Sequence, residues 1–239
     1  MTLLVVLLAI LVGIDRAASY LTALELASRA QKAEHLKHQP HVVVRGFPFL
    51  TQVMSGRYDR VDVTVRDLAV PASAPTGGLD IAELHVTVRG VHVSFGDVLH
   101  GDVRRVPVDR GDATARISYA TLDAALNRQL PGGLIAIHTS AGRDGQIALA
   151  GAYTGPGAPV SVRGLAGVTI ADGRIRVTPV PSTLAALPSI VRGRVVSALS
   201  VSFSLPELPF DVHLESAHAE RDGVVLTATA EHLVLVRPS

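Results

Sequence analysis

The start of the chain is uniformly apolar and then helical in its pattern. Residues 2–14 (TLLVVLLAILVGI) form an uncharged apolar run. Residues 15–37 are rich in Ala, Leu, Glu and Lys and contain no Gly or Pro, so they predict a helix. This helix can be continuous with the apolar run.

From His41 onward, apolar and polar residues alternate. In residues 60–66, Val61, Val63 and Val65 share one side of the chain, and charged or polar residues share the other. A spacing of two predicts a strand with one buried face and one face in water. The same alternation recurs in residues 84–93, 173–177 and 223–236. Asp-Gly pairs that favour tight hairpins lie at 144–145, 172–173 and 222–223.

Two segments have helical spacing instead. Ser118 can cap a helix that ends at the Pro-Gly-Gly of residues 131–133. Its apolar positions are three to four residues apart: Tyr119, Leu122, Leu126 and Leu130. A second helix is predicted from about Ser189 to Ser200. Long antiparallel strands with helices packed on one face indicate an α+β fold.

The apolar run also bears on where the protein works. A secretory signal core has about 7–15 residues and a membrane-spanning helix about 20, so residues 2–14 have the length of a signal. No Lys or Arg precedes the run, and Ala17 and Ser19 offer only an approximate cleavage site. A cleaved signal and an uncleaved signal anchor both stay open, and a buried N-terminal helix of a cytosolic protein is the third alternative. We expect residues 1–37 to be a signal or anchor segment with a helix, and residues 38–239 to form one domain.

Composition narrows the function further. Of 239 residues, 48% are hydrophobic but only 4% are aromatic, and Trp is absent, so the apolar surface is aliphatic. The formal net charge of +1 gives no electrostatic basis for binding nucleic acid. Because Cys is absent, the protein has no disulfide and is not a lipoprotein acylated on cysteine.

The usual catalytic motifs are absent. The sequence has no G-x-S-x-G elbow, no H-E-x-x-H and no P-loop. His35, His38 and His41 are three residues apart, but Pro40 interrupts a helical arrangement, so we interpret them as solvated. His85 and His92 differ in parity along one predicted strand, which places them on opposite faces. We therefore expect no enzyme, no metal and no cofactor.

Two Pro-punctuated segments concentrate the few Phe residues. Residues 46–52 (GFPFLTQ) contain Phe47 and Phe49, and residues 205–210 (LPELPF) contain Phe210. One interpretation makes them tight corners that fill the core. The other makes them the wall of a cleft for acyl chains, because such clefts are mostly apolar.

Three stretches together resemble a known family: G-F-P-F-L-T-Q at 46–52, G-R-Y-D-R-V-D-V at 56–63, and L-P-F-D-V-H-L at 208–214 leading to D-G-V-V at 222–225. They resemble the LmeA-like family of actinobacterial cell-envelope phospholipid-binding proteins, which are linked to mannan and lipomannan elongation. The resemblance implies a fold similar to tubular lipid-binding (BPI-like) domains, in which a long curved antiparallel β-sheet wraps helices. It also implies a protein on the periplasmic face of the inner membrane that binds phospholipid, with phosphatidylinositol-type lipids suspected.

We therefore predict an envelope protein that binds or transfers phospholipid. The alternatives are a non-catalytic scaffold for envelope glycosyltransferases and, third, an envelope hydrolase or transferase. The residues predicted to line the acyl groove are Phe47, Phe49, Leu50, Ile190, Val191, Leu199 and Phe203. Those predicted to hold the head group at its rim are Arg45, Arg57, Arg192 and Arg194, since guanidinium groups fork onto phosphate.

Overall fold

The structure is a computed structural model that describes residues 2–33, 37–69, 80–94, 96–97, 105–129, 134–154, 159–171, 174–204 and 213–236. Its first half contains α1 (Thr2–Ala33), β1 (His41–Arg45), α2 (Phe49–Ser55), β2 (Arg57–Leu68), β3 (Ile81–His92), β4 (Arg105–Ile117) and α4 (Tyr119–Gln129). Its second half contains β5 (Leu134–Ala141), β6 (Ile147–Tyr153), β7 (Val160–Ala171), β8 (Arg174–Pro179), the 3-10 helix η1 (Pro181–Leu184), α5 (Ser189–Leu199), β9 (Val201–Ser204), β10 (His213–Glu220) and β11 (Gly223–Val236).

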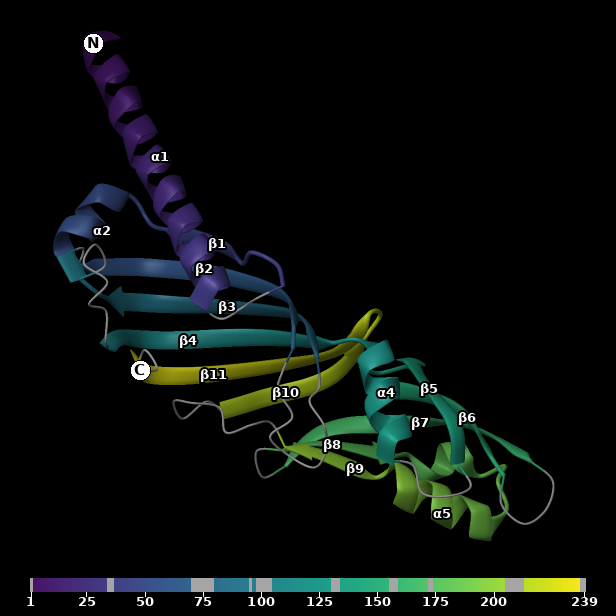
Figure 1. Cartoon of the computed structure of the whole chain (residues 1–239). Coiled ribbons are helices and arrows are strands. Elements are labelled where there is room, and N and C mark those ends of the chain that lie inside the picture. The colour runs from purple at the N-terminus through teal and green to yellow at the C-terminus, as the bar shows by residue number, and fades with distance from the viewer. Residues whose placement is uncertain are drawn as a thin grey trace.

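The strands form two antiparallel sheets that lie end to end (Figure 1). The large sheet has the order β1-β2-β3-β4-β11-β10, and the small sheet has the order β5-β6-β7-β8-β9. Strands β10 and β11 come from the end of the chain and complete the large sheet beside β4. This confirms the predicted α+β class with antiparallel strands, although the strands divide between two sheets.

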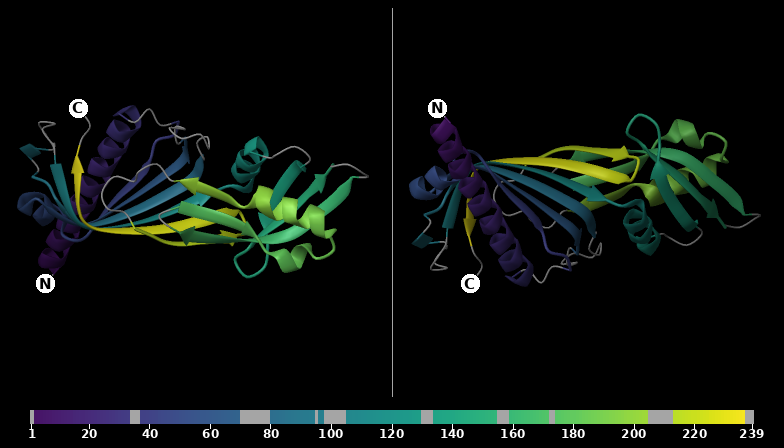
Figure 2. Two further views of the ribbon diagram at one scale, coloured as in Figure 1. Left: turned by 90° about the horizontal axis from the view of Figure 1, so that it is seen from below. Right: turned by 90° about the horizontal axis from the view of Figure 1, so that it is seen from above.

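Helix α1 lies at the β1 side of the large sheet, and its N-terminal end projects beyond the strands (Figures 1 and 2). Ala23 and Ala27 are buried on its inner side, and the Ser19 hydroxyl donates a hydrogen bond to the Val44 carbonyl at 3.1 Å. The small side chains allow the helix backbone to approach β1 closely. The expected helix over 15–37 is thus confirmed to Ala33, and it is continuous with the apolar run.

The local predictions of hairpin and helix are also confirmed in the described residues. Asp144 and Gly145 connect β5 to β6 with φ of +52° and +70°, as a type I′ turn requires. The Ser118 hydroxyl accepts the Thr121 N–H at 3.2 Å and so caps α4. Helix α5 starts at Ser189 as expected. The Asp172-Gly173 pair, Leu130 and the segment 205–210 lie outside the described residues.

The main core lies where the two sheets meet. Side chains from the small sheet, α4, α5 and η1 pack against Ile117, Val224 and Leu226 of the large sheet. Because one core draws on both sheets, the two parts stabilise each other. A second, smaller core lies under α2, where Phe49 and Val44 pack with the ends of β2 to β4 and β11.

A transverse kink crosses the large sheet near α2. The paired positions of β2, β3, β4 and β11 skip Asp59, Gly90, Asp109 and His232, respectively. Gly90 has φ +61°, and a Cβ there would overlap the Asp109 carboxylate, so the position requires glycine.

The kink corrects one expectation about β3. It shifts the alternation of side chains by one residue, so Val91 is buried in the smaller core and His92 lies beside Asp109 at 3.2 Å. His85 and His92 consequently lie on the same face, and the prediction of opposite faces was wrong because it assumed an unbroken strand.

Candidate functional site

One face of the large sheet is apolar across all six strands. Directly paired residues share a face. One such row crosses the whole sheet: Val42, Val63, Val86, Ala113, Ala228 and Leu214. The next row towards α2 is Val44, Val61, Val88, Gly111 and Ala230, and the next towards the small sheet is Val65, Leu84, Ala115, Leu226 and Ala217. We call these three rows the apolar face.

The apolar face is only partly buried over its middle. The central side chains of β2 and β3, such as Val63, Leu84 and Val86, are half-buried, as are Ala113 and Ala115 of β4. The face residues of β4 (Gly111, Ala113 and Ala115) are small, as are Ala228 and Ala230 of β11. They lie between the larger Val and Leu side chains of β2 and β3 on one side and Leu214 of β10 on the other. Leu233 reaches over Gly111, where an added Cβ would lie 2.9 Å from its Cδ1. An aliphatic ligand could lie lengthwise on such a surface without meeting a polar group.

The opposite face of the same sheet is polar and highly charged. Arg45, Arg60, Arg89 and Arg110 are direct cross-strand neighbours. Like charges in such positions repel. Two carboxylates of the adjacent row offset the repulsion: Asp62 pairs with Arg45 and with Arg60, and Asp112 pairs with Arg89 and Arg110.

Asp62 is the buried member of this ladder, with its side chain 6% exposed. Burial alone would raise its pKa, but hydrogen bonds from Arg45, Arg60 and Thr87 outweigh burial and lower the pKa to about 2. Its carboxylate is therefore charged at neutral pH and holds three strands together. This polar ladder is structural, because each of its acids is already paired.

Near the kink, the first group of predicted site residues comes together at α2. Phe49 is 3% exposed and packs against the Tyr58 ring, with the ring centroids 6.3 Å apart. Phe47 and Leu50 are 54% and 38% exposed and point outward. Of the two interpretations of residues 46–52, the core corner therefore fits Phe49, whereas Phe47 and Leu50 belong to an accessible surface.

The two arginines predicted beside this group are both exposed and both paired. Arg45 binds Asp62, and Arg57 binds Asp109 with Nη2 and Oδ2 3.2 Å apart. Their side chains are 58% and 60% exposed, so a phosphate could reach either guanidinium.

The second group of predicted residues lies at the far end of the molecule, in and around α5. Ile190 is 73% exposed, Val191 is half-buried, and Leu199 is 1% exposed in the main core. The Arg194 guanidinium donates to the Tyr153 hydroxyl at 2.7 Å, and Arg192 is half-buried on the same helix. Phe203 is in β9, paired with Ile175.

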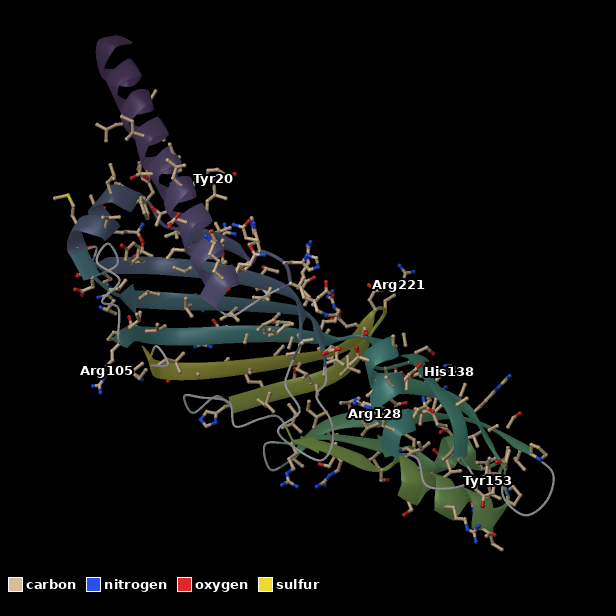
Figure 3. All side chains as sticks on the ribbon, in the orientation of Figure 1. Tyr20, Arg105, Arg128, His138, Tyr153 and Arg221 are labelled. Atoms are coloured by element: carbon tan, nitrogen blue, oxygen red, sulfur yellow. The ribbon has the colours of Figure 1, made fainter. Side chains whose placement is uncertain are left out.

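The structure does not bring the two groups of predicted residues to one place. Tyr153, beside Arg194, and Tyr20, on α1, mark the two ends in Figure 3. The role of each of these residues in lipid contact stays a prediction. What the sequence analysis missed is the apolar face between them. Its signal was the alternation of Val61, Val63 and Val65, which we used to predict strands and not to locate a site.

No candidate metal site occurs among the described residues. Nowhere in them do His, Asp and Glu side chains gather in a group able to hold a metal ion. His38, one of the three histidines in question, lies 3.3 Å from Asp67 in an exposed pair, and His35 lies outside the described residues. None of the described helices has the length and apolarity needed to cross a membrane.

Comparison with known proteins gives one match. A family model described as LmeA-like phospholipid-binding matches residues 13–229. It therefore covers the second half of α1, every strand from β1 to β10 and the first half of β11. No curated protein and no solved structure matched the chain.

Proposed function

This chain belongs to the LmeA-like phospholipid-binding family, and we propose that it binds the acyl chains of its phospholipid on the apolar face of the large sheet. The family is one of lipid binding and not of catalysis, so the protein acts by holding a lipid. The single observation that carries the proposal is the row of six apolar residues that crosses every strand of the sheet while its middle stays only half-buried.

The energetics of such a face suit a reversible lipid carrier. Each methylene removed from water contributes about 0.8 kcal/mol, so a long acyl chain gains several kcal/mol from partial burial alone. The small residues Ala113 and Ala115 leave room for the chain, and the larger Val63 and Val86 lie beside them on β2 and β3. Because the three rows of the face carry no polar side chain, the face selects for aliphatic length and leaves head-group choice to its ends.

For the head group, the predicted arginines next to α2 are Arg45 and Arg57; both lie on the polar face, so a head group reaches them around the α2 end of the sheet. The predicted arginines at α5 are Arg192 and Arg194. Arg57 is the easiest to recruit, because its partner Asp109 is shared with His92 and is itself 53% exposed. A phosphate that replaced Asp109 would gain a bidentate guanidinium contact. A phosphatidylinositol-type head group is our preferred ligand.

The setting that we propose is the cell envelope, on the periplasmic face of the inner membrane, in support of mannan or lipomannan elongation. The family membership supports phospholipid binding. The envelope setting and the polymer pathway are proposals that rest on the apolar run and on the resemblance in residues 46–52 and 208–214. A scaffold for envelope glycosyltransferases is the alternative that the following experiment separates.

The experiment compares a bulky substitution on the apolar face with the same substitution at the next residue of the same strand, on the polar face. Ala113 lies on the apolar face, and the next residue, Thr114, is exposed on the polar face. We expect Ala113→Phe to displace roughly two methylenes of lipid, about 1.6 kcal/mol, and so to reduce bound phospholipid more than tenfold. Thr114→Phe adds the same side chain outside the site and serves as the matched control.

The measurement is native mass spectrometry with lipid extraction on the full-length protein and both variants. Stoichiometric phospholipid on the parent and Thr114→Phe, with loss from Ala113→Phe, supports the proposal. Equal lipid on both variants places the lipid elsewhere. A parent protein that carries no lipid, refuses added phosphatidylinositol and captures glycosyltransferases supports the scaffold alternative instead.

A further inference from the structure

Five large apolar side chains are exposed on α2, on the segment just before it and on the turn of α1 that contacts α2. Met54 is 89% exposed, and Leu50 and Phe47 are 38% and 54% exposed. On α1, Leu11 and Ile14 are 54% and 56% exposed, within about one turn of the residue that contacts α2. We call these five residues the apolar corner. Exposed apolar residues that gather at one place mark an interaction site more often than scattered ones do.

The corner is held in place by a buried carboxylate. Asp15 on α1 is 1% exposed, and its Oδ1 accepts the Leu50 N–H at 2.8 Å. Burial by itself would raise the pKa of Asp15, but hydrogen bonds from the Phe49 and Leu50 N–H groups and the charge of Arg16 lower it. Helix α2 has no side-chain cap of its own at Pro48, so Asp15 supplies that cap from 35 residues away.

Because of this link, α2 presents two different sides. Phe49 and Gln52 are buried beneath it, and the Gln52 Oε1 accepts the Asp59 N–H at 2.9 Å. Leu50 and Met54 are one turn apart on the outer side. Neither belongs to the cores formed by the described residues, so the outer side of α2 is free to contact a partner.

The chemistry of the corner fits a phospholipid bilayer. The uncharged residues 2–14 of α1 precede it in the sequence, so the corner follows an apolar stretch of the helix. Arg16 lies at its border, with its guanidinium carbon 5.1 Å from the Phe47 ring centroid. An apolar surface bordered by a cation matches the boundary between acyl chains and anionic head groups, where long side chains place the charge outward.

We propose that the apolar corner docks on the bilayer from which the protein takes its lipid, and that α2 inserts to the level of the head groups. This inference rests on the proposed function and adds two things: the surface that contacts the lipid-donating bilayer, and the end of the sheet where the acyl chain enters. Phe49, on the inner side of α2, packs with Val44 at the end of the apolar face. Docking through α2 therefore places that end of the face against the membrane, and an acyl chain moves along the sheet away from it.

The absence of Trp from the sequence gives a clean reporter. In the full-length Met54→Trp variant, the single indole samples the outer side of α2. With vesicles of phosphatidylcholine and phosphatidylinositol, we expect a blue shift of its emission, and strong quenching when the lipids are brominated on their acyl chains. Thr178→Trp, at an exposed position of β8 on the small sheet, is the control and should show neither change.

Three results would overturn the proposal. The first is indole emission from the Met54→Trp variant that does not change with vesicles. The second is a blue shift that grows with protein concentration in the absence of vesicles, which indicates a second copy of the chain as the partner. The third is a response from Ile190→Trp in place of Met54→Trp, since Ile190 is exposed at the opposite end and would mark that end as the docking surface.

A kinetic experiment separates docking from lipid binding. We expect Met54→Asp to slow extraction of phosphatidylinositol from vesicles about tenfold, and to bind a short-chain phosphatidylinositol, dispersed as monomers, as the parent does. The matched control Thr178→Asp should extract at the parental rate. Loss of monomer binding in Met54→Asp contradicts docking and assigns α2 to the lipid site, whereas a parent that binds no monomer contradicts the proposed function itself.

Discussion

The two sheets use the same alternating pattern for different purposes. On the small sheet, inward residues such as Ile137, Ile147 and Val162 are completely buried, because α4, α5 and η1 cover them. On the large sheet, inward residues such as Val63 and Val86 are only half-buried. No described helix packs on them in the way that α4 and α5 pack on the small sheet. The covered face gives stability, and the partly open face is where we propose that the lipid binds.

The largest expected effect concerns the covered face. Leu184 of η1 is 1% exposed and lies over Gly164, where an added Cβ would be 3.2 Å from its Cγ. We expect Leu184→Ala to lower the free energy of unfolding by about 3 kcal/mol, because the cavity under η1 cannot collapse. Urea denaturation measures this loss in the free energy of unfolding. The amount of phospholipid per folded molecule should be unchanged, and a parallel loss of lipid would show that the main core contributes to the site.

A smaller effect concerns how the large sheet holds together without a covering helix. Asp62 links Arg45 and Arg60, and its pKa of about 2 lies below the ordinary value of 3.8. A lowered folded-state pKa contributes stability above the unfolded pKa, and this contribution is lost as the pH falls from about 4 to 2. The shift corresponds to about 2 kcal/mol.

The substitution Asp62→Asn tests whether Asp62 is the source of this pH-dependent stability. It should remove about 2 kcal/mol of the pH dependence of unfolding between pH 5 and 2 and lower stability at pH 7 by a similar amount. The free energy of unfolding is measured by urea titration at several pH values. A parent and an Asp62→Asn variant with equal slopes would assign the acid sensitivity to other carboxylates.

The sequence predicted the elements better than it predicted the site, and particular residues show why. Ser118, the Asp144-Gly145 turn and the Val61–Val63–Val65 alternation act locally, so their consequences are visible in a short window. Helix α2 was missed because its cap comes from Asp15, far away in the sequence. The row from Val42 to Leu214 is also invisible in one dimension, since β10 and β11 join β4 only in the folded chain.

The predicted groove residues illustrate the same limit. Phe47, Phe49 and Leu50 were chosen as an apolar group, yet Phe49 fills the smaller core while its two neighbours point outward. A Phe49→Asp variant would therefore test folding before it tested lipid binding. Ile190 and Leu199 of α5 were both predicted to line the groove, but one is exposed and the other buried, because α5 covers the small sheet with only one side.

The smallest expected effect on stability comes from a leucine on the apolar face. Leu84 lies in the row of the apolar face nearest the small sheet and is half-buried, so Leu84→Ala makes the same chemical change as Leu184→Ala on an open surface. We expect a loss of only about 1 kcal/mol in the free energy of unfolding, because water already reaches the side chain. Phospholipid affinity should fall several-fold, since the acyl chain loses roughly one methylene contact. We therefore expect Leu184→Ala to cost mainly folding stability and Leu84→Ala to cost mainly phospholipid affinity. Equal losses of both quantities in the two variants would mean that the two faces do not differ in function.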